Sequence, residues 1–327
     1  MSLQISVQAY SSVFYEDWQK VIAQSSNGTF MHARSYMDYH KDRFVDASVL
    51  VYLEELPVAI FPAHRLGDAV YSHEGLSYGG VVVNRRLNTK AILGIFKALL
   101  KYYLSESIEH LYIKAVPSFY HRSSTEWLSY VMFLLGAEIF RTDLSFAIPL
   151  PADFSLYSKG RKWGLNKAKR AVLSIREVQD FHPFWQEVLI PNLWERHGVS
   201  PVHCVEEIER LAINNIPYIR QFDVFEGDQL VAGMTVYDCS TTAHAQYIAA
   251  TPRGKALSAL DLLVGHLIRN EFSDKAYFDF GIVNEAQGTK INQGLMEWKE
   301  SFGAKPYVHP FYKVETRQWG ALEAVMA

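Results

Sequence analysis

The sequence has 327 residues, a formal net charge of −3 and 49% hydrophobic residues, which is enough apolar material for two domains of ordinary size. A near-neutral charge argues against DNA binding, because general nucleic-acid binders need an excess of basic residues. The two cysteines, Cys204 and Cys239, have no metal-ligand spacing and form no disulfide framework, so we expect a reducing compartment and no metal site.

The first half begins with mostly helical patterns over residues 1–48, interrupted by a turn at Ser25-Ser26-Asn27-Gly28. Residues 48–53 and 56–61 favour two strands joined at Glu54-Glu55, which is typical of a hairpin. A strand led by two glycines is expected at 78–83, and another strand at 110–115. Between them, Thr89 stands at the start of a predicted helix with an apolar stripe formed by Ile92, Ile95, Phe96, Leu99 and Leu100.

The proline-bracketed stretch Ile148-Pro149-Leu150-Pro151 predicts a boundary between two domains, 1–150 and 151–327. A basic segment without acidic residues follows it, containing Lys159, Arg161, Lys162, Lys167, Lys169 and Arg170. Such a segment is either a solvated helix face or a surface that attracts an anionic substrate. The candidate substrate-binding residues are Lys167, Lys169 and Arg170.

The second half repeats the order of the first. Residues 222–225 and 230–237 favour a hairpin with its turn at 226–229, and strands are expected at 246–249 and 276–280. Between these strands lies a helical stripe formed by Leu260, Leu263, Val264, Leu267 and Ile268. The repeated order predicts two copies of one domain, with 48–117 corresponding to 222–283. Chance similarity of common elements is the alternative.

The turn between the third strand and the helix, Thr251 to Ala259, is a candidate phosphate site. A strand, a basic glycine-containing turn and a helix together offer backbone N–H groups and a positive dipole end to an anion. Ser258 followed by Asp261 three residues later matches a capping box, which predicts that the helix begins at Ser258. The alternative is an ordinary helix on a sheet, with Arg253 and Lys255 merely solvated.

Three stretches of the second half together resemble the GNAT superfamily of acyltransferases, in particular its twin-domain branch that includes the FemABX-like peptidoglycan aminoacyltransferases. Residues 159–176 are similar to the family's basic helix, and YIAATPRGKALSALDLL is similar to its strand, phosphate-binding turn and helix. The tail is similar to the family ending in Asp279-Phe280-Gly281, Gly294-Leu295, Trp298-Lys299-x-x-Phe302-Gly303 and Tyr312. The first half, with TFMHARSYMDYHKDRF and LSYGGVVV, also looks like the family's N-terminal copy.

The resemblance implies an α/β fold of the α+β type, with two GNAT-like domains whose mixed sheets are flanked by helices. It also implies transfer of an acyl group, most simply acetyl, from acyl-CoA to an amine of a small molecule or a cell-wall precursor. The implied donor-binding residues are Ala249, Ala250, Thr251, Arg253, Gly254, Lys255, Ala256, Leu257, Ser258 and Ala259. Lys299 and Tyr312 are the implied cationic and acid groups, and Asp279 is a base or an orienting group.

Two alternatives stay open at this point. One is a tRNA-dependent, FemABX-like aminoacyltransferase acting on a peptidoglycan precursor, although the long helical hairpin that holds tRNA in some such enzymes is not evident. The other is a non-catalytic binding protein that retains the fold. No apolar run is long enough to predict a transmembrane segment and the N-terminus lacks a signal-peptide pattern, so we expect a cytoplasmic protein. Five histidines are expected to be surface or core groups rather than ligands: His32, His64, His73, His244 and His309.

Overall fold

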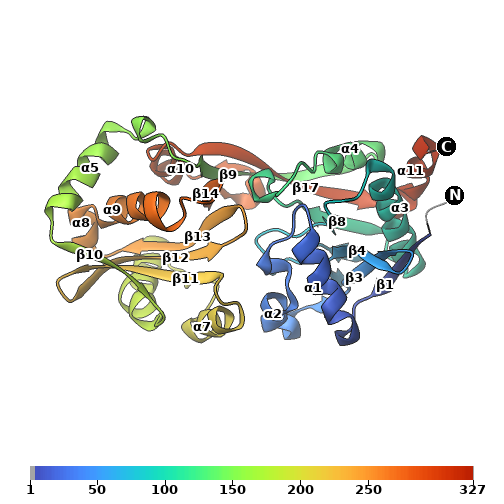
Figure 1. The fold of residues 1–327 in the computed structure, drawn as a ribbon, viewed down its shortest axis with the longest axis horizontal. Helices are drawn as coiled ribbons and strands as arrows, with labels where there is room; N and C mark the ends of the chain where they lie inside the picture. Colours follow the sequence, from blue (N-terminus) through green and yellow to red (C-terminus); the bar gives the residue numbers. More distant parts are fainter. Residues whose placement is uncertain (1–3, 327) are drawn as a thin grey trace. The chain divides into compact units, whose positions relative to one another are not determined.

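The computed structural model describes residues 4–326, which form two compact units (Figure 1). Unit 1 contains the chain up to Asp143 together with the C-terminal segment from Val308, and unit 2 runs from Leu144 to Tyr307. Each unit combines β-sheet with flanking helices, which confirms the predicted class of fold. The C-terminal segment packs in unit 1, so unit 1 is formed by two separate stretches of the chain. The continuous ranges 1–150 and 151–327 therefore do not coincide with these units.

Unit 2 is built on a sheet of order β10-β11-β12-β13-β14-β9. Its strands are β10 (Leu173–Val178), β11 (Ile219–Glu226), β12 (Gln229–Asp238), β13 (Thr242–Ala250), β14 (Tyr277–Ile282) and the end of β9 (Glu138–Pro149), with a small hairpin β15 (Asn284–Glu285) and β16 (Lys290–Ile291). All neighbours in this sheet pair antiparallel except β13 and β14, which are parallel. The β11–β12 hairpin is where the sequence predicts it.

The helices of unit 2 are α5 (Lys159–Arg170), α6 (Ile190–His197), α7 (Val205–Asn214), α8 (Pro252–Leu257), α9 (Ala259–His266) and α10 (Gln293–Glu300). Helix α9 and the helical turn that follows it, Leu267–Glu271, carry the predicted apolar stripe. Leu263, Val264 and Leu267 are fully buried in one cluster with Phe278 of β14. Burying side chains of this size stabilises the unit by roughly 1.5–3 kcal/mol each. The helix is therefore fixed against the sheet on the side where the chain turns after β13.

Unit 1 holds two groups of strands, ordered β1-β3-β4-β7 and β17-β8-β6-β5-β2. The strands are β1 (Ile5–Ala9), β2 (Val45–Asp46), β3 (Val49–Leu53), β4 (Leu56–Phe61), β5 (His64–Leu66), β6 (Ala69–Tyr71), β7 (Val82–Val83), β8 (His110–Lys114) and the end of β17 (Lys305–Glu315). The helices are α1 (Tyr15–Gln24), α2 (Arg34–Met37), α3 (Thr89–Ser105), α4 (Trp127–Leu134) and α11 (Trp319–Met326).

The two units repeat one order of elements. In unit 1 a strand, a hairpin and a further antiparallel strand (β1, β3–β4, β7) precede helix α3 and strand β8. In unit 2 the corresponding elements are β10, β11–β12, β13, then α8 and α9, then β14. Both β8 and β14 finally pair antiparallel with a strand from a distant part of the chain, β17 and β9 respectively. This order is the one expected for a duplicated domain, and superposition of 48–117 on 222–283 stays a prediction.

Two details of the first half differ from the sequence-based expectation. Residues 5–9 form a strand, whereas the pattern there suggests a helix; Ile5 and Val7 alternate and pack against the unit 1 core, which is strand periodicity. Helix α3 is capped by Asn88 rather than Thr89, because the Asn88 Oδ1 accepts a 2.9 Å hydrogen bond from the Ala91 N–H. Both predictions are wrong because of local interactions, and neither difference changes the order of the later elements.

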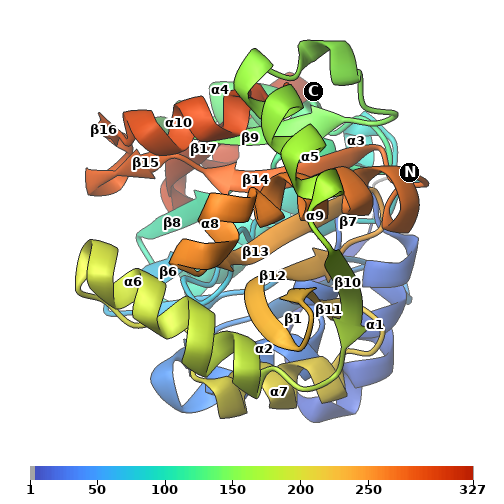
Figure 2. The same cartoon turned by 90° about the vertical axis from the view of Figure 1, so that its left-hand side faces the viewer.

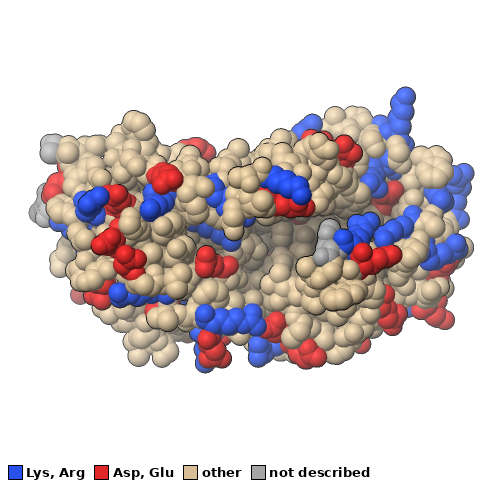
Figure 3. Space-filling view, turned by 180° about the vertical axis from the view of Figure 1, so that it is seen from behind, with Lys and Arg blue, Asp and Glu red and all other residues tan. Residues whose placement is uncertain are grey.

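The surface carries both signs of charge without one dominant patch in the view of Figure 3, where basic and acidic side chains are interspersed. This distribution agrees with the small net charge of the sequence. No helix within residues 4–326 is long and apolar enough to cross a membrane.

We expect Leu322→Ala in α11 to destabilise unit 1 selectively. Leu322 is fully buried in the unit 1 core, and removing a buried leucine side chain typically costs about 2–5 kcal/mol of unfolding free energy. The matched control is Val325→Ala on the same helix, where the valine is 48% exposed. Hydrogen-exchange mass spectrometry should show faster exchange in α3 and β8 of Leu322→Ala only. Equal exchange in both variants would contradict the assignment of the C-terminal segment to unit 1.

We also expect unit 1 to lose stability as pH falls from 7 to 5. Burial lowers the pKa of His32 to about 4, of His73 to about 3 and of His121 to about 4, whereas the unfolded value is about 6.5. Below pH 6.5 the unfolded chain binds protons that the folded unit does not, so the stability present above 6.5 decreases. At pH 5 the loss is up to about 2 kcal/mol for each of the three.

Denaturation that is monitored through the hydrogen exchange of α3, and repeated at several pH values, measures this loss of stability. A denaturation midpoint that stays constant between pH 7 and pH 5 would show that these histidines are not held neutral.

Candidate functional site

The parallel pair β13 and β14 separates part of the way along, and a cleft opens where the pairing ends. The two strands are in register at Thr242 and Tyr277, Ala243 and Phe278, and His244 and Asp279, and are not paired beyond these residues. At this point β14 has a positive φ of 75° at Gly281, and its register with β9 shifts. The strands β13, β12 and β14 and the helices around them are labelled in Figure 2.

The cleft has a volume of about 870 Å³ and lies wholly within unit 2. Its walls come from β13, β14, the turn after β13, and helices α5, α6 and α10. In the described part of the chain the charged lining residues are basic at Arg161, Arg196, Lys255 and Lys299 and acidic at Asp261 alone. Such a lining suits an anionic ligand, since several cations in one cleft raise its local concentration.

The turn after β13 forms the predicted strand, turn and helix with a different start. Helix α8 begins at Pro252, and the N-cap is Thr251, whose hydroxyl accepts a 3.1 Å bond from the Gly254 N–H. Ser258 lies in the left-handed region (φ 57°) between α8 and α9 and makes no side-chain capping bond. The predicted capping box is therefore wrong, because Ser258 joins two helical segments instead of preceding the first.

Gly254 is required by a close approach of backbone to backbone. A Cβ atom at this position would lie 2.1 Å from the Val231 carbonyl oxygen of β12, far inside contact distance. Glycine thus lets α8 pack directly on the sheet and brings Lys255, Ser258 and Ala259 to the cleft wall. Three more of the predicted donor-binding residues line the cleft, namely Ala249, Ala250 and Gly254. The remaining four are not among its lining residues: Thr251, Arg253, Ala256 and Leu257.

The backbone of Ala250 faces away from β12. Thr251 N donates to Val231 O at 2.9 Å, and Ala250 O accepts a 3.1 Å bond from the Asn192 side chain of α6. Because backbone direction alternates along an antiparallel pair, the N–H of Ala249 faces the ladder with β12, and the N–H of Ala250 faces the cleft side. Of these two residues of the predicted donor-binding set, Ala250 has the N–H direction that suits binding of an oxyanion in the cleft.

Arg161 and Asp261 form an ion pair at one end of the cleft. The Arg161 Nη1 lies 2.6 Å from the Asp261 Oδ1, and its Nε donates to the Ser301 hydroxyl at 2.7 Å. The guanidinium also stacks on Phe302, 4.6 Å from the ring centroid. Burial raises the pKa of Asp261 against the opposing effect of Arg161. The pair joins α5, α9 and α10 and fixes the wall at the start of α9.

Lys299 is buried at the cleft wall, and its ammonium group is hydrogen-bonded to backbone carbonyl groups. The side chain is 3% exposed, and its Nζ donates to Gly281 O and Ile282 O of β14 at 2.8 Å each. Burial lowers the pKa of Lys299 to about 8, and the charge of Asp279 opposes this effect only in part. These two bonds hold the bent end of β14 against α10.

Asp279 is 2% exposed and lies beside the last paired residue of β13. Its Oδ1 accepts bonds from the Ser145 hydroxyl at 3.0 Å and from the Gly281 N–H at 2.7 Å. Its Oδ2 lies 2.7 Å from the Nδ1 of His244. The sequence pattern identifies Asp279 as a candidate but gives no signal for His244, whose partner is 35 residues away.

The remaining predicted residues lie elsewhere. Tyr312 belongs to β17 in unit 1, where it is 6% exposed in the apolar core, so the unit 2 cleft does not contain it. Lys167, Lys169 and Arg170 are on α5 but are not lining residues, and Lys169 and Arg170 are exposed. Arg253 forms an ion pair with Glu226 outside the cleft lining. Asn192 and Arg196, which do line it, have no sequence signal because their helix lies far away along the chain.

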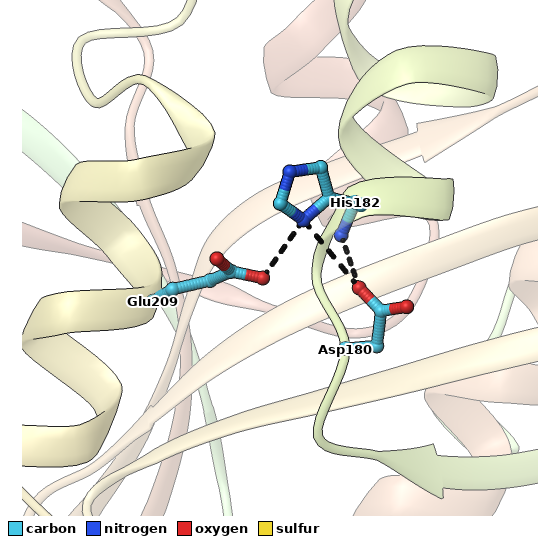
Figure 4. A group of neighbouring side chains, drawn as sticks. All are labelled: Asp180, His182 and Glu209. Carbon is cyan, nitrogen blue, oxygen red and sulfur yellow. Dashed lines mark hydrogen bonds and ion pairs between the residues drawn. The ribbon is translucent and has the colours of Figure 1, made fainter.

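An exposed group of potential metal ligands lies away from the cleft lining (Figure 4). His182 Nδ1 lies 2.9 Å from Glu209 Oε1 and 3.6 Å from Asp180 Oδ1, and Asp180 Oδ1 also accepts a 2.9 Å bond from the His182 N–H. These contacts pair the three groups with one another and cap the following helical turn. Since exposed acidic groups commonly make such contacts without a metal, we base no site on them.

Comparison with known proteins identifies structures of similar fold and finds no relative by sequence. No family model matches the chain, and no curated protein matches it. Among solved structures, the chain shares its fold with FemX, which matches with a TM-score of 0.69 and 8% identity over 95% of this chain and 98% of FemX. L-PGS from Bacillus licheniformis matches at 0.60 and 9% identity over 95% of this chain and 94% of that one. A tandem GNAT protein of the clavulanic acid biosynthesis pathway matches at 0.51 and 11% identity over 96% and 99%.

We expect Lys299→Met to lower the stability of unit 2. The substitution leaves two buried carbonyl groups without their donor, which costs about 1–3 kcal/mol. The difference from wild type should grow from about pH 8 to about pH 10, because the unfolded lysine still binds a proton there while the folded one, with its pKa of about 8, has lost it.

Urea denaturation at pH 7, 8, 9 and 10 tests both statements, with the exposed Lys305→Met as the control. Parallel stability curves for the two variants would show that the Lys299 ammonium group is not held as described.

Proposed function

We propose that the chain is an N-acyltransferase that binds an activated acyl donor in the cleft of unit 2 and transfers the acyl group to an amine. The observation that carries this proposal is the separation of β13 and β14, which opens a basic cleft beside the beginning of α9. The GNAT-superfamily, FemABX-like fold supports the same class of reaction. The two kinds of donor proposed below, acyl-CoA and aminoacyl-tRNA, both occur in the cytoplasm, and we place the reaction there.

For the donor we propose acyl-CoA, with its phosphates near Lys255, Ser258 and Ala259. The N-terminal end of a helix attracts anions through its free N–H groups and its dipole, and α9 begins at Ala259 within the lining. Lys255 adds a cation at the same wall. The acyl chain would then extend between β13 and β14 toward the end of their pairing.

A second donor class, aminoacyl-tRNA, is favoured by a different observation. Trp163 on α5 is 61% exposed, and the Lys167 Nζ lies 5.0 Å from the centre of its ring. Exposed aromatic rings beside cations stack on the bases of single-stranded nucleic acid, and Lys169 and Arg170 extend the basic surface. With this donor the acceptor would be a peptidoglycan precursor, as the similarity to FemX suggests.

The chemistry requires stabilisation of a tetrahedral oxyanion and an amine free to attack the carbonyl carbon. The Ala250 N–H is the proposed oxyanion donor, because it points away from the β12 ladder. Lys299 has three N–H donors and uses two on β14 carbonyls, so one is left for the developing negative charge. Positioning of donor and amine in the cleft supplies the rest of the rate enhancement.

The function is tested by direct transfer assays with mass-spectrometric detection. Purified protein is incubated with acetyl-CoA, longer acyl-CoAs or charged tRNA, each with polyamines or a UDP-linked muramyl peptide as acceptor. We expect an acylated amine with one donor class. Binding of a donor without any acylated product would instead support the non-catalytic alternative.

We expect Lys255→Gln to weaken CoA binding, whereas Arg253→Gln should not. Lys255 lines the cleft, and Arg253 is two residues away but pairs with Glu226 outside the lining. Loss of one charge-assisted contact to phosphate is expected to raise the Kd about ten-fold. Isothermal titration calorimetry with CoA measures both variants. Equal weakening in the two, or none in either, would contradict a phosphate position at Lys255.

A further inference from the structure

His244 and Asp279 form the last paired residues of β13 and β14 before the strands separate. Their register pairing places the imidazole directly against the carboxylate, with His244 Nδ1 lying 2.7 Å from Asp279 Oδ2. A Cβ atom on Gly281 would lie 3.3 Å from the Cε1 atom of His244, so the backbone of β14 also limits the ring. The imidazole is thus fixed next to Ala245 and Gln246, the following residues of β13, which line the cleft.

Asp279 is itself held in one orientation. Its Oδ1 accepts bonds from the Ser145 hydroxyl of β9 and from the Gly281 N–H, and the residue is 2% exposed. With both oxygens engaged, the carboxylate cannot turn away from the ring. This arrangement selects the imidazole tautomer with hydrogen on Nδ1 and leaves Nε2 as the nitrogen available for proton exchange.

The Nε2 atom points toward a residue of the cleft wall. It lies 3.1 Å from the end of the Gln246 carboxamide. Because the neutral Nε2 accepts hydrogen bonds, the carboxamide pairs with it when it is turned so that its NH2 group donates to the ring. Gln246 lines the cleft together with Ala245. The His244 side chain is 12% exposed, so it is not sealed in the core. A base that is oriented by a carboxylate on one nitrogen and reaches a cleft-lining side chain with the other has the arrangement of general-base catalysis.

The other unit 2 histidines whose side chains the structure describes lack this combination. His203 is 3% exposed and its Nδ1 is bonded to the Tyr247 hydroxyl at 2.6 Å. His266 at the end of α9 is bonded to Asn270, and His182 is paired with Glu209. Unlike His244, none of the three is bonded to a side chain that lines the cleft.

We propose that His244 is the proton acceptor of the transfer reaction and that Asp279 is its positioning residue; this inference rests on the proposed N-acyltransferase function. The acceptor amine gives one proton to Nε2 as its nitrogen forms the C–N bond with the acyl carbonyl carbon. The bond from that carbon to the donor sulfur or oxygen then breaks. The imidazolium returns the proton to the leaving thiolate or alkoxide, so atoms and charge balance.

Several polar and ionisable groups surround His244. Asp279 faces it from β14, Tyr237 from β12 with ring centres 6.3 Å apart, and Ser145 reaches Asp279 from β9. Lys299 on α10 donates to the carbonyl of Gly281, whose added Cβ atom would meet the ring. The pH profile of His244→Gln therefore has to be compared with that of Asp279→Asn, which keeps the shape of the site and removes the carboxylate charge.

The experiment measures kcat and KM against pH for wild type, His244→Gln, His244→Ala, Asp279→Asn and the control His266→Gln, with acetyl-CoA, longer acyl-CoAs and charged tRNA as donors. We expect His244→Gln to lower kcat by about 100-fold or more and to remove the acidic limb of the kcat profile, with KM for the donor unchanged. Added imidazole should partly restore His244→Ala. Asp279→Asn should lower kcat less and shift the same limb.

The outcomes separate the inference from the function on which it rests. If wild type and His266→Gln transfer acyl groups and His244→Gln does so at the same rate, the role of His244 is refuted and the proposed function remains. A His244→Ala variant that folds but is not restored by imidazole, with an unchanged pH profile in His244→Gln, refutes the role as well. If wild type transfers no acyl group from any of the donors, the proposed function falls together with the role of His244.

Discussion

The candidate site depends on one constraint, the end of backbone pairing between β13 and β14 after His244 and Asp279. Two parallel strands separated beyond this point leave N–H and C=O groups without ladder partners, and such groups have to be satisfied by other means. Here Asn192 binds the Ala250 carbonyl, and Lys299 binds the carbonyls of Gly281 and Ile282. The opening is therefore maintained by side chains from α6 and α10 that also form the walls of the cleft.

The charges of the cleft follow from the same arrangement. Lys299 is buried, and its ammonium group donates hydrogen bonds to the carbonyls of β14. Arg161 is held by Asp261, Ser301 and the face of Phe302. Lys255 and Arg196 are exposed lining residues, and neither is required to hold the strands apart. Structural cations and ligand-binding cations are thus distinct groups in one cleft, which is why removal of Lys299 and removal of Lys255 have different physical consequences.

The sequence predicts the elements better than it predicts the site. Periodicity locates α3, α9 and both hairpins, because apolar spacing depends only on neighbours along the chain. It fails at Ser258, whose left-handed backbone is set by the junction of two helical segments, and at Arg253, which pairs with Glu226 from another turn. The tail motif points to Lys299 and Asp279, whereas Tyr312 lies in the other unit. His244, Asn192 and Arg196 become candidates only through contacts between distant segments, which no local pattern encodes.

Comparison of the two units explains why the site belongs to unit 2. In unit 2 the strand after the helix, β14, pairs in parallel with β13, the strand before the helix. In unit 1 the corresponding strand β8 pairs in parallel with β6, which comes from the additional hairpin β5–β6, and Tyr71 stacks on Tyr112 with ring centres 4.4 Å apart. The additional hairpin thus takes the place beside β8 that β13 takes beside β14. A cavity in the unit 1 core, lined by side chains such as Phe61, Phe96 and Ile113, has a volume of only about 10 Å³, compared with about 870 Å³ for the unit 2 cleft. We therefore assign the proposed ligand-binding role to unit 2, where the strands before and after the helix are paired at one end and separate at the other.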